Sequence, residues 1–245
     1  MSEFQYKEED EVGENTLDVI SNADRFNSWM YSVISKYTYG EILEIGSGIG
    51  NISACYLENQ RKITLSDIRE IYCKRLREKF ERFPALQAVK LIDLADPKFS
   101  ETYRSELNKY DSIFALNVVE HIENDHQAIA NAKSMLKPGG QLVILVPAYQ
   151  TLYNKFDIGL EHYRRYTQKS LCKLFTDNKL EVLHRQYFNF IGIFGWYVSG
   201  KLMKNDSIPE GQMGLFNTLV PVFKAFDKII LNRMGLSVIA VGKKV

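Results

Sequence analysis

The sequence EILEIGSGIGNIS at residues 41–53 joins three kinds of local structure in a row. The apolar run at 41–45 predicts a short buried strand. Gly46, Gly48 and Gly50 predict a tight turn, because glycine tolerates positive φ and lets the backbone approach a ligand closely. Residues 51–59 predict a helix, whose first N–H groups are free to bind a ligand.

The next hundred residues alternate between apolar strands and amphipathic or charged helices. Strands that are apolar on both faces indicate a parallel sheet with helices on both sides. We therefore predict the α/β fold class, a doubly wound and mostly parallel sheet covered by helices on both faces. The further strands are expected at 62–66, 89–91, 111–116 and 141–146, and the helices at 69–82, 98–108 and 125–136.

No repeat, linker or low-complexity segment divides the chain, so we predict a single domain over residues 1–245. Its parts are an N-terminal tail and helix at 1–40, a cofactor-binding core at 41–146, and a substrate-side insertion with C-terminal elements at 147–245. The tail at 1–16 is acidic and is expected to be loose or to form a short lid. Beyond the core segments, helices are expected at 22–37, 167–178, 187–203 and 213–231, and strands at 180–185 and 236–241.

Composition excludes several classes of protein. Lys and Arg number 31 against 30 Asp and Glu, so no strong field favours a nucleic-acid partner. Cys55, Cys73 and Cys172 are scattered and odd in number, which argues against a disulfide framework and a structural zinc site. The N-terminus is not a secretory signal, and no apolar run reaches the roughly 18 residues of a membrane span. We expect a cytoplasmic protein.

Acidic residues around the glycine turn predict the kind of cofactor. Asp67 ends the next strand about 20 residues after the first glycine, where a carboxylate accepts both hydroxyls of a ribose. Asp93 follows the third strand and is placed to face an adenine. The dinucleotide fingerprint would have its third glycine at position 51, which here is Asn51. Glu44 would repel a pyrophosphate but attract an ammonium group, so an amino-acid-bearing nucleoside is favoured.

The run EIGSGIGNIS, Asp67, Asp93, the segment LNVVEHIEND and the turn LKPGG together resemble class I S-adenosylmethionine-dependent methyltransferases. The resemblance spans residues 41–146 and implies a Rossmann-like sheet of seven strands with the last one antiparallel. It also implies S-adenosylmethionine as the cofactor and S-adenosylhomocysteine as the product. The cofactor-binding residues that it implies are Glu44, Gly46, Ser47, Gly48, Gly50, Asp67, Ile68, Asp93, Leu94, Asn117 and Val118.

The remainder of the chain is similar to a narrower group. The stretches VPAYQTLYNKFDIGLEHYRRYT, YFNFIGIFGWYVSG and GLSVIAVGKK resemble methyltransferases that occur alongside glycosyltransferases in bacteria. The acceptors of that group are mostly unassigned, so this likeness names no substrate. The acceptor atom therefore stays open between oxygen, nitrogen and carbon.

Two histidines are candidate bases. His121 lies just beyond the fourth strand, where ligands bind in open α/β sheets, and imidazole titrates near neutrality. His162 is the second candidate. The alternative for His121 is that it only caps the following segment or packs against the cofactor. We predict no metal, because the Glu and His spacing at 120–126 matches no helical His pair of the known zinc motifs.

The insertion at 148–166 combines aromatic and basic side chains and is too long for a routine connection. Its arginines can hold a phosphate or carboxylate in bidentate geometry, which predicts a small or lipid-like acceptor with an anionic group. The alternative is that an arginine pairs with Asp157 or Glu161 within the loop. The candidate substrate-binding residues are Tyr149, Tyr153, Tyr163, Arg164, Arg165 and Tyr166.

The apolar segments at 187–203 and 213–231 allow three arrangements: core helices, a lid over the acceptor, or a peripheral membrane contact. The chain is expected to act as a monomer or homodimer. We predict in-line methyl transfer, with a nicotinamide-dependent oxidoreductase and a non-catalytic nucleoside-binding protein as alternatives.

Overall fold

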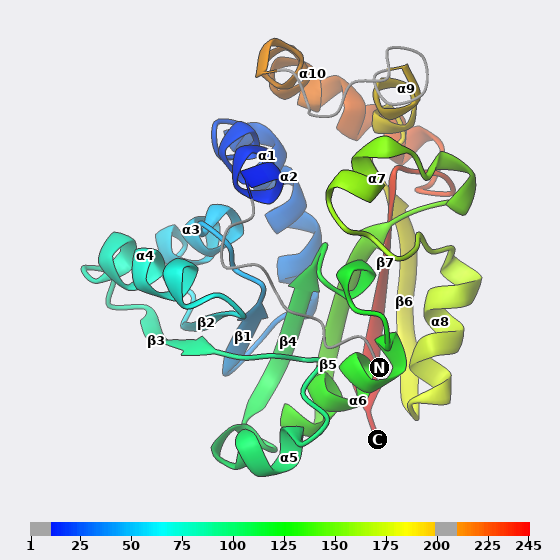
Figure 1. The fold of residues 1–245 in the computed structure, drawn as a ribbon. Helices are drawn as coiled ribbons and strands as arrows, with labels where there is room; N and C mark the ends of the chain where they lie inside the picture. Colours follow the sequence, from blue (N-terminus) through cyan, green and yellow to red (C-terminus); the bar gives the residue numbers. More distant parts are fainter. Residues whose placement is uncertain (1–10, 199–209) are drawn as a thin grey trace.

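The computed structural model describes residues 11–198 and 210–245 and shows one sheet with helices on both faces (Figure 1). The strand order is β3-β2-β1-β4-β5-β7-β6, and β7 runs antiparallel to both of its neighbours. This is the seven-stranded, mostly parallel sheet expected from the sequence. The strands are β1 (Ile42–Ile45), β2 (Ile63–Asp67), β3 (Leu86–Leu91), β4 (Tyr110–Leu116), β5 (Leu136–Pro147), β6 (Leu180–Phe188) and β7 (Ser237–Lys244).

Helices pack against the two faces of the sheet in separate groups (Figure 1). The α-helices are α1 (Glu11–Ser21), α2 (Asp24–Ile34), α3 (Asn51–Glu58), α4 (Glu70–Phe80), α5 (Phe99–Thr102), α6 (Asp125–Met135), α7 (Lys155–Gly159), α8 (Gln168–Asp177), α9 (Gly192–Trp196) and α10 (Glu210–Ile229). The 3-10 helices are η1 (Ser35–Tyr37), η2 (Arg104–Glu106), η3 (Val119–His121) and η4 (Gln150–Leu152).

Neighbouring residues of the buried strands serve opposite faces, because side chains alternate along a strand. Leu43 of β1 belongs to the core formed with α5, α6 and α8. Ile42, its neighbour, belongs to the core formed with α2, α3, α4 and α10. The sheet is therefore buried on both faces, which explains why its strands are apolar without alternation.

Three predicted elements differ from the structure. The expected helix at 98–108 is reduced to α5 and η2. The expected helix at 187–203 is wrong in part, because Tyr187 and Phe188 extend β6, and the helical part is α9 followed by a π-helical turn at Tyr197 and Val198; residues 199–203 lie outside the described residues. The turn at 137–140 forms the start of β5, since the strand pairs with β4 from Leu136 onward across a register shift.

The N-terminal tail is helical where it is described. Residues 11–21 form α1, which lies beside α2 near the carboxyl ends of the strands (Figure 1). The expectation of a loose tail is corrected for these residues, and residues 1–10 lie outside the described part. Within the described residues, none of the helices is long and apolar enough to cross a membrane.

The buried carboxyl of Glu106 joins η2 to strands β3 and β4, and its pKa predicts how stability depends on pH. Burial raises the pKa of the Glu106 carboxyl, but hydrogen bonds from Lys90, Tyr110 and Lys109 outweigh it and bring the pKa to about 2. A carboxyl whose folded pKa lies below its unfolded value stabilises the protein above the unfolded pKa. That stabilisation is lost as the pH falls toward 2.

We therefore expect Glu106→Gln to lower the free energy of unfolding at pH 7 and to have little effect near pH 2. Urea unfolding at a series of pH values measures this difference. Glu70→Gln is the control, because Glu70 pairs with Arg77 at an exposed site and such pairs contribute about 0–1 kcal/mol. An equal loss for both variants at every pH would contradict the assignment.

Candidate functional site

A cavity of about 480 Å³ opens at the carboxyl ends of the parallel strands. Its wall combines polar residues at the ends of β1 to β4 with apolar residues from the helices above the sheet. This volume is in the range of small-molecule binding sites, which is about 300 to 1,000 Å³. The polar and glycine residues of its wall that the sequence singled out are Glu44, Gly46, Ser47, Gly48, Asp67, Asp93 and Asn117, joined by Ile68, Leu94 and Val118.

Glu44 is a buried carboxyl at the cavity wall. Its Oε2 accepts a hydrogen bond from Ser53 Oγ at 2.5 Å, so the start of α3 holds its orientation. Burial raises the pKa of Glu44 to about 7, against the lowering effect of the Ser53 and Ser47 hydroxyls. A cationic group bound beside Glu44 would favour its ionised form.

The Asp67 carboxylate connects the glycine turn to β2. Its Oδ2 accepts a hydrogen bond from the Gly48 N–H at 2.8 Å, and Oδ1 accepts one from the Arg69 N–H at 3.0 Å. Burial raises the pKa of Asp67, and these backbone donors lower it. Because a carboxylate accepts several hydrogen bonds, Asp67 retains acceptor capacity toward the cavity.

Asp93 and Asn117 end the next strands along the cavity. Asp93 Oδ1 accepts a hydrogen bond from the Ala95 N–H at 2.7 Å, which fixes the loop after β3. Asn117 has a φ of 52° and donates its N–H to the Leu145 carbonyl. This left-handed conformation turns the chain sharply at the end of β4 and leaves the Asn117 side chain exposed.

The three glycines of the turn have different surroundings. A Cβ on Gly46 would lie 2.4 Å from Val118 Cγ2, and a Cβ on Gly48 would lie 3.0 Å from Leu17 Cδ1. Gly50 is absent from the described cavity wall; its Cβ would instead meet Phe80 of α4 at 2.4 Å. Gly50 therefore allows close packing of α3 on α4, a role that the motif did not distinguish from ligand contact.

Helices α1 and α2 close one side of the cavity, which the sequence did not predict by residue. Leu17, Ile20, Asn27 and Met30 line it, and Asn51 Nδ2 donates to the Leu17 carbonyl at 3.1 Å. The amphipathic pattern showed that α2 has a buried face. It carried no signal to separate contact with the core from contact with a ligand.

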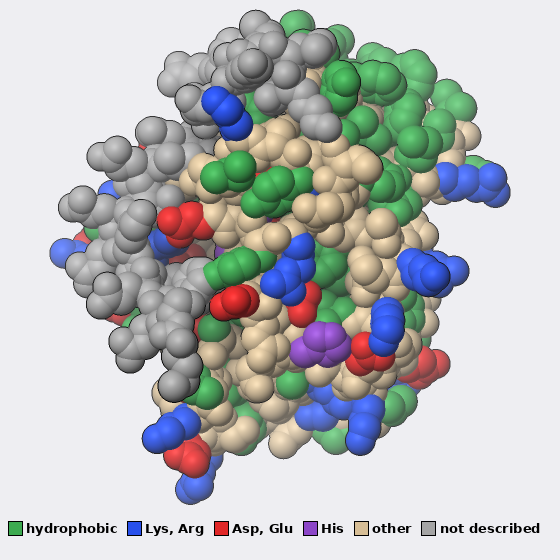
Figure 2. Space-filling view, turned by 45° about the vertical axis from the view of Figure 1, so that its right-hand side comes forward, with side chains coloured by type: hydrophobic (Ala, Val, Ile, Leu, Met, Phe, Trp, Pro, Cys, Tyr) green, Lys and Arg blue, Asp and Glu red, His purple; other side chains and the backbone are tan. Residues whose placement is uncertain are grey.

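The opposite part of the wall is apolar and comes from α7, α9 and α10. Phe156 and Trp196 lie with their ring centroids 5.0 Å apart, and Met213 and Phe216 belong to the same wall. Figure 2 shows hydrophobic side chains gathered over the upper part of the molecule, where Figure 1 places α9 and α10. The exposed apolar side chains of α10 are Leu215, Leu219, Val222, Phe226 and Ile229.

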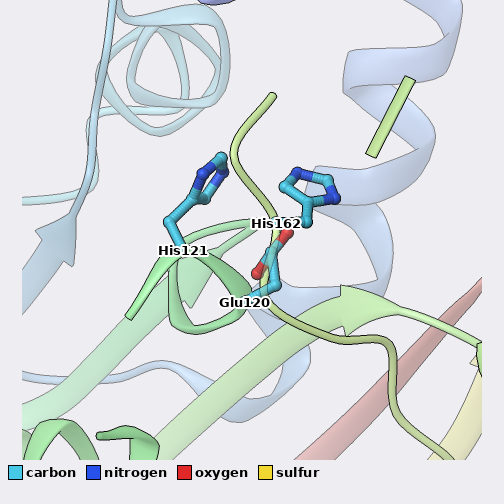
Figure 3. A group of neighbouring side chains, drawn as sticks. All are labelled: Glu120, His121 and His162. Carbon is cyan, nitrogen blue, oxygen red and sulfur yellow. The ribbon is translucent and has the colours of Figure 1, made fainter. Parts of the chain in front are cut away.

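Glu120, His121 and His162 lie together beside the cavity, with the Glu120 carboxylate below and between the two rings (Figure 3). The imidazole centroids are 4.5 Å apart at an angle of 85°. The Tyr163 N–H donates to the Glu120 carbonyl at 2.8 Å and so joins the insertion to η3. Both histidines line the cavity, as expected for the candidate bases.

Burial sets the ionisation of this cluster. It raises the pKa of Glu120 to about 7, while the neighbouring His162 lowers it. Burial, with His162 as a second cause, lowers the pKa of His121 to about 3, so the His121 ring is neutral at physiological pH.

Asp157 is fully buried and organises the insertion. Its Oδ1 contacts His162 Nδ1 at 2.9 Å and accepts from Arg165 Nε at 2.8 Å, and its Oδ2 accepts from the Asn154 N–H. Burial raises the pKa of Asp157, but His162 and Arg165 outweigh it and lower the pKa overall. The alternative in which an insertion arginine pairs with Asp157 therefore describes Arg165.

Arg164 and the tyrosines of the insertion point to other partners. Arg164 pairs with Asp125 at 3.0 Å and donates to the Glu123 carbonyl. Among the described residues that line the cavity, the predicted substrate-binding set is represented by Arg165 alone. Tyr149, Tyr153, Tyr163, Arg164 and Tyr166 are not part of this wall, so the motif did not distinguish the side chain that reaches the cavity from those that do not.

Comparisons with known proteins identify the domain. Residues 43–142 match the family described as "Methyltransferase domain". The chain is 28% identical over 133 residues to the hybrid PKS-NRPS synthetase thnA of Trichoderma harzianum, covering 51% of this chain and 3% of that protein. The chain therefore spans a small part of this relative. The likeness to glycosyltransferase-associated bacterial proteins gains no support from it.

Solved structures agree on the fold. Phosphoethanolamine N-methyltransferase 2 of Haemonchus contortus, in complex with S-adenosyl-L-methionine, superposes with a TM-score of 0.61 at 14% identity, over 99% of this chain and 58% of that one. The [4+2]-cyclase SpnF superposes with a TM-score of 0.59 at 13% identity, over 90% of this chain and 80% of that one. The superpositions establish the fold, and at these low sequence identities they leave the substrate open.

The contact of Gly46 with Val118 predicts a difference between two glycine positions. Gly46 and Gly139 both have positive φ, of 71° and 81°, but a Cβ on Gly139 would meet nothing within 4 Å. Each change to Ala costs about 1–2 kcal/mol of backbone strain. Gly46→Ala should cost about 1–3 kcal/mol more, because its methyl group displaces Val118.

Urea unfolding of Gly46→Ala and Gly139→Ala measures this difference. Equal destabilisation of the two variants would show that the turn has room for a side chain. That result would contradict a close-fitting glycine turn at the cavity wall.

Proposed function

We propose that this chain, whose residues 43–142 match a methyltransferase domain, binds S-adenosylmethionine in the cavity at the carboxyl ends of β1 to β4 and methylates a small or lipid-like acceptor there. The observation that carries the proposal is the convergence of Glu44, Asp67, Asp93 and Asn117 on one cavity. These side chains lie at or just after the carboxyl ends of four strands, and all four line the same cavity.

The residues of the wall suit the parts of this cofactor. Glu44 would hold the ammonium group of the methionine moiety, and Gly46 and Gly48 leave space for it because they lack side chains. Asp67, oriented by two backbone N–H groups, would accept the ribose hydroxyls. Asp93 and Leu94 would flank the adenine, and Asn117 and Val118 would contact the methionine end from β4.

Methyl transfer from this cofactor requires the protein mainly to position the acceptor and to exclude water. S-adenosylmethionine, when bound, supplies a methyl group that is already activated by its sulfonium. The chain's own residues then align the acceptor, exclude water and remove a proton where the acceptor has one to lose. The apolar wall from α7, α9 and α10 serves the first two purposes.

His121 is the first candidate base and His162 the second. The His121 ring is neutral at physiological pH because burial lowers its pKa to about 3. A base this weak accepts a proton only from an atom that becomes acidic as it is methylated. His162 is held by Asp157 through Nδ1, which leaves its other ring nitrogen available.

The apolar wall favours an acceptor with a hydrophobic part. Phe156, Trp196, Met213 and Phe216 form this side of the cavity, and α10 continues from it as an exposed apolar surface. An amphipathic or lipid-like molecule would place its hydrophobic part here, and a peripheral membrane contact of α10 would bring such molecules close. Arg165 is the candidate contact for an anionic group, although Asp157 already holds its Nε.

The two alternatives have less support. A nicotinamide-dependent oxidoreductase would have to bind a pyrophosphate beside Glu44, at a turn with Asn51 in place of the third glycine. A non-catalytic protein would not require His121 and His162 to line the same cavity as the cofactor residues. Neither a cytoplasmic location nor a monomeric or dimeric state is needed for the proposed reaction, and both remain predictions.

Asp67 provides the first test of the cofactor site. Asp67→Asn should weaken S-adenosylmethionine binding about 10- to 100-fold, because charge-assisted hydrogen bonds to the ribose contribute about 1.5–3 kcal/mol. Asp96→Asn is the matched control: Asp96 also accepts a backbone N–H, from Lys98 at 2.7 Å, but it is not part of the described cavity wall. Isothermal titration calorimetry measures both affinities, and equal weakening would remove the ribose role.

Glu44 provides a test through pH. With a pKa of about 7, the free carboxyl is mostly neutral at lower pH, and a bound ammonium group favours the ionised form. Affinity for S-adenosylmethionine should rise by up to about tenfold per pH unit below 7 and level off above it. Glu44→Gln should bind more weakly at pH 7.5 and lose this dependence. The same pH profile in both proteins would contradict the assignment.

A further inference from the structure

In the described part of the chain, the carboxyl group of Glu120 is buried and makes no hydrogen bond. It is 0% exposed, and neither of its oxygens has a hydrogen-bond partner among the described residues. Burying such a group is costly unless a proton or a cation compensates its charge. Its position between two imidazoles supplies the remaining ligands for a cation (Figure 3).

We propose that Glu120, His121 and His162 bind one divalent transition-metal ion of the Zn²⁺ type in the wall of the cavity. The three residues each offer one donor atom, and these atoms all lie within 4.8 Å of one another. Donor atoms that share a tetrahedral zinc ion at about 2.1 Å lie about 3.4 Å apart. A small rotation of the half-buried His121 side chain would bring its donor atom to this spacing.

The surroundings of His162 are those of a metal ligand. Asp157 is fully buried and contacts His162 Nδ1 at 2.9 Å, so the other ring nitrogen is presented to Glu120 and His121. Carboxylates that hold the second nitrogen of a histidine orient the ring and strengthen it as a ligand. Arg165 and the Asn154 N–H hold Asp157 in turn, so this support is rigid.

The donor set indicates the class of metal. Two imidazoles and one carboxylate suit zinc and other first-row transition metals, whereas Mg²⁺ prefers oxygen ligands. Three protein ligands leave a coordination position open. Because His121 and His162 line the cavity, that position faces the acceptor side.

This geometry extends the proposed function and rests on it in one respect: the open position would take a hydroxyl or carboxylate oxygen of the acceptor. The metal would then orient the acceptor and favour loss of its proton. In this metal-bound form His121 and His162 would act as ligands rather than as the bases considered above, because their cavity-facing nitrogens would be coordinated. The metal site itself depends only on the side chains of η3 and the insertion. The two parts are therefore tested separately.

The test uses the full chain, freed of metal by a chelator and dialysed. Zn²⁺ is titrated calorimetrically, and Co²⁺ is added as a coloured substitute whose visible absorption reports coordination. We expect one site per chain, binding Zn²⁺ at least about tenfold more tightly than Mg²⁺. Glu120→Gln and His121→Asn should each weaken Zn²⁺ binding about 100-fold and abolish the Co²⁺ absorption. His126→Asn is the matched control, because His126 is exposed and contacts Asp177 and Asn178 instead of the cluster.

S-adenosylmethionine binding is measured on the same preparations. Glu120→Gln should keep the cofactor affinity and lose the metal, whereas Asp67→Asn should lose the cofactor affinity and keep the metal. Zn²⁺ binding that is absent, or that is equal in wild type, Glu120→Gln and His121→Asn, would overturn the metal site. If the wild type binds Zn²⁺ but does not bind S-adenosylmethionine, the proposed function is overturned and the metal site stands.

Discussion

Parallel pairing of β1 with both β2 and β4 is the constraint on which the site depends. Since parallel strands end at the same edge of a sheet, this pairing brings Glu44, Asp67 and Asn117 to one cavity although they are far apart in sequence. The buried apolar faces fix the register, because a shift by one residue would turn Leu43 and Ile42 to the wrong helix layers. The strand-end part of the site is therefore positioned by the core beneath it.

The insertion is attached to this frame through buried polar contacts. The Tyr166 N–H donates to the Pro147 carbonyl, and the Tyr163 N–H donates to the Glu120 carbonyl, each at 2.8 Å. Asp157 adds the ion pair with Arg165 at a fully buried position. Such a pair rigidifies a loop because removing either partner leaves an uncompensated charge. Its consequence is the placement of His162 beside His121, which no local pattern requires.

Local sequence pattern placed the proposed cofactor-binding residues at one edge of the sheet, but it did not separate the insertion residues that line the cavity from those that do not. Glu44, Gly46 and Asp67 lie where strand ends and a turn put them, so short-range pattern and sheet geometry suffice. Arg164 and Arg165 are adjacent in sequence, yet one pairs with Asp125 at the surface and the other with buried Asp157. That difference is set by the path of an irregular loop, which has no periodicity to predict it.

The same distinction applies to the fold. Apolar strands, amphipathic helices and the glycine turn determined the α/β class, most of the element order and the sheet edge at which the cavity lies, because these depend on local periodicity and backbone conformation. The tertiary structure alone decided that Gly50 packs on α4, that α1 and α2 close the cavity, and that Glu120 meets His162. These are contacts between segments distant in sequence, and their partners are selected by packing and by the pairing of buried charges rather than by any local pattern.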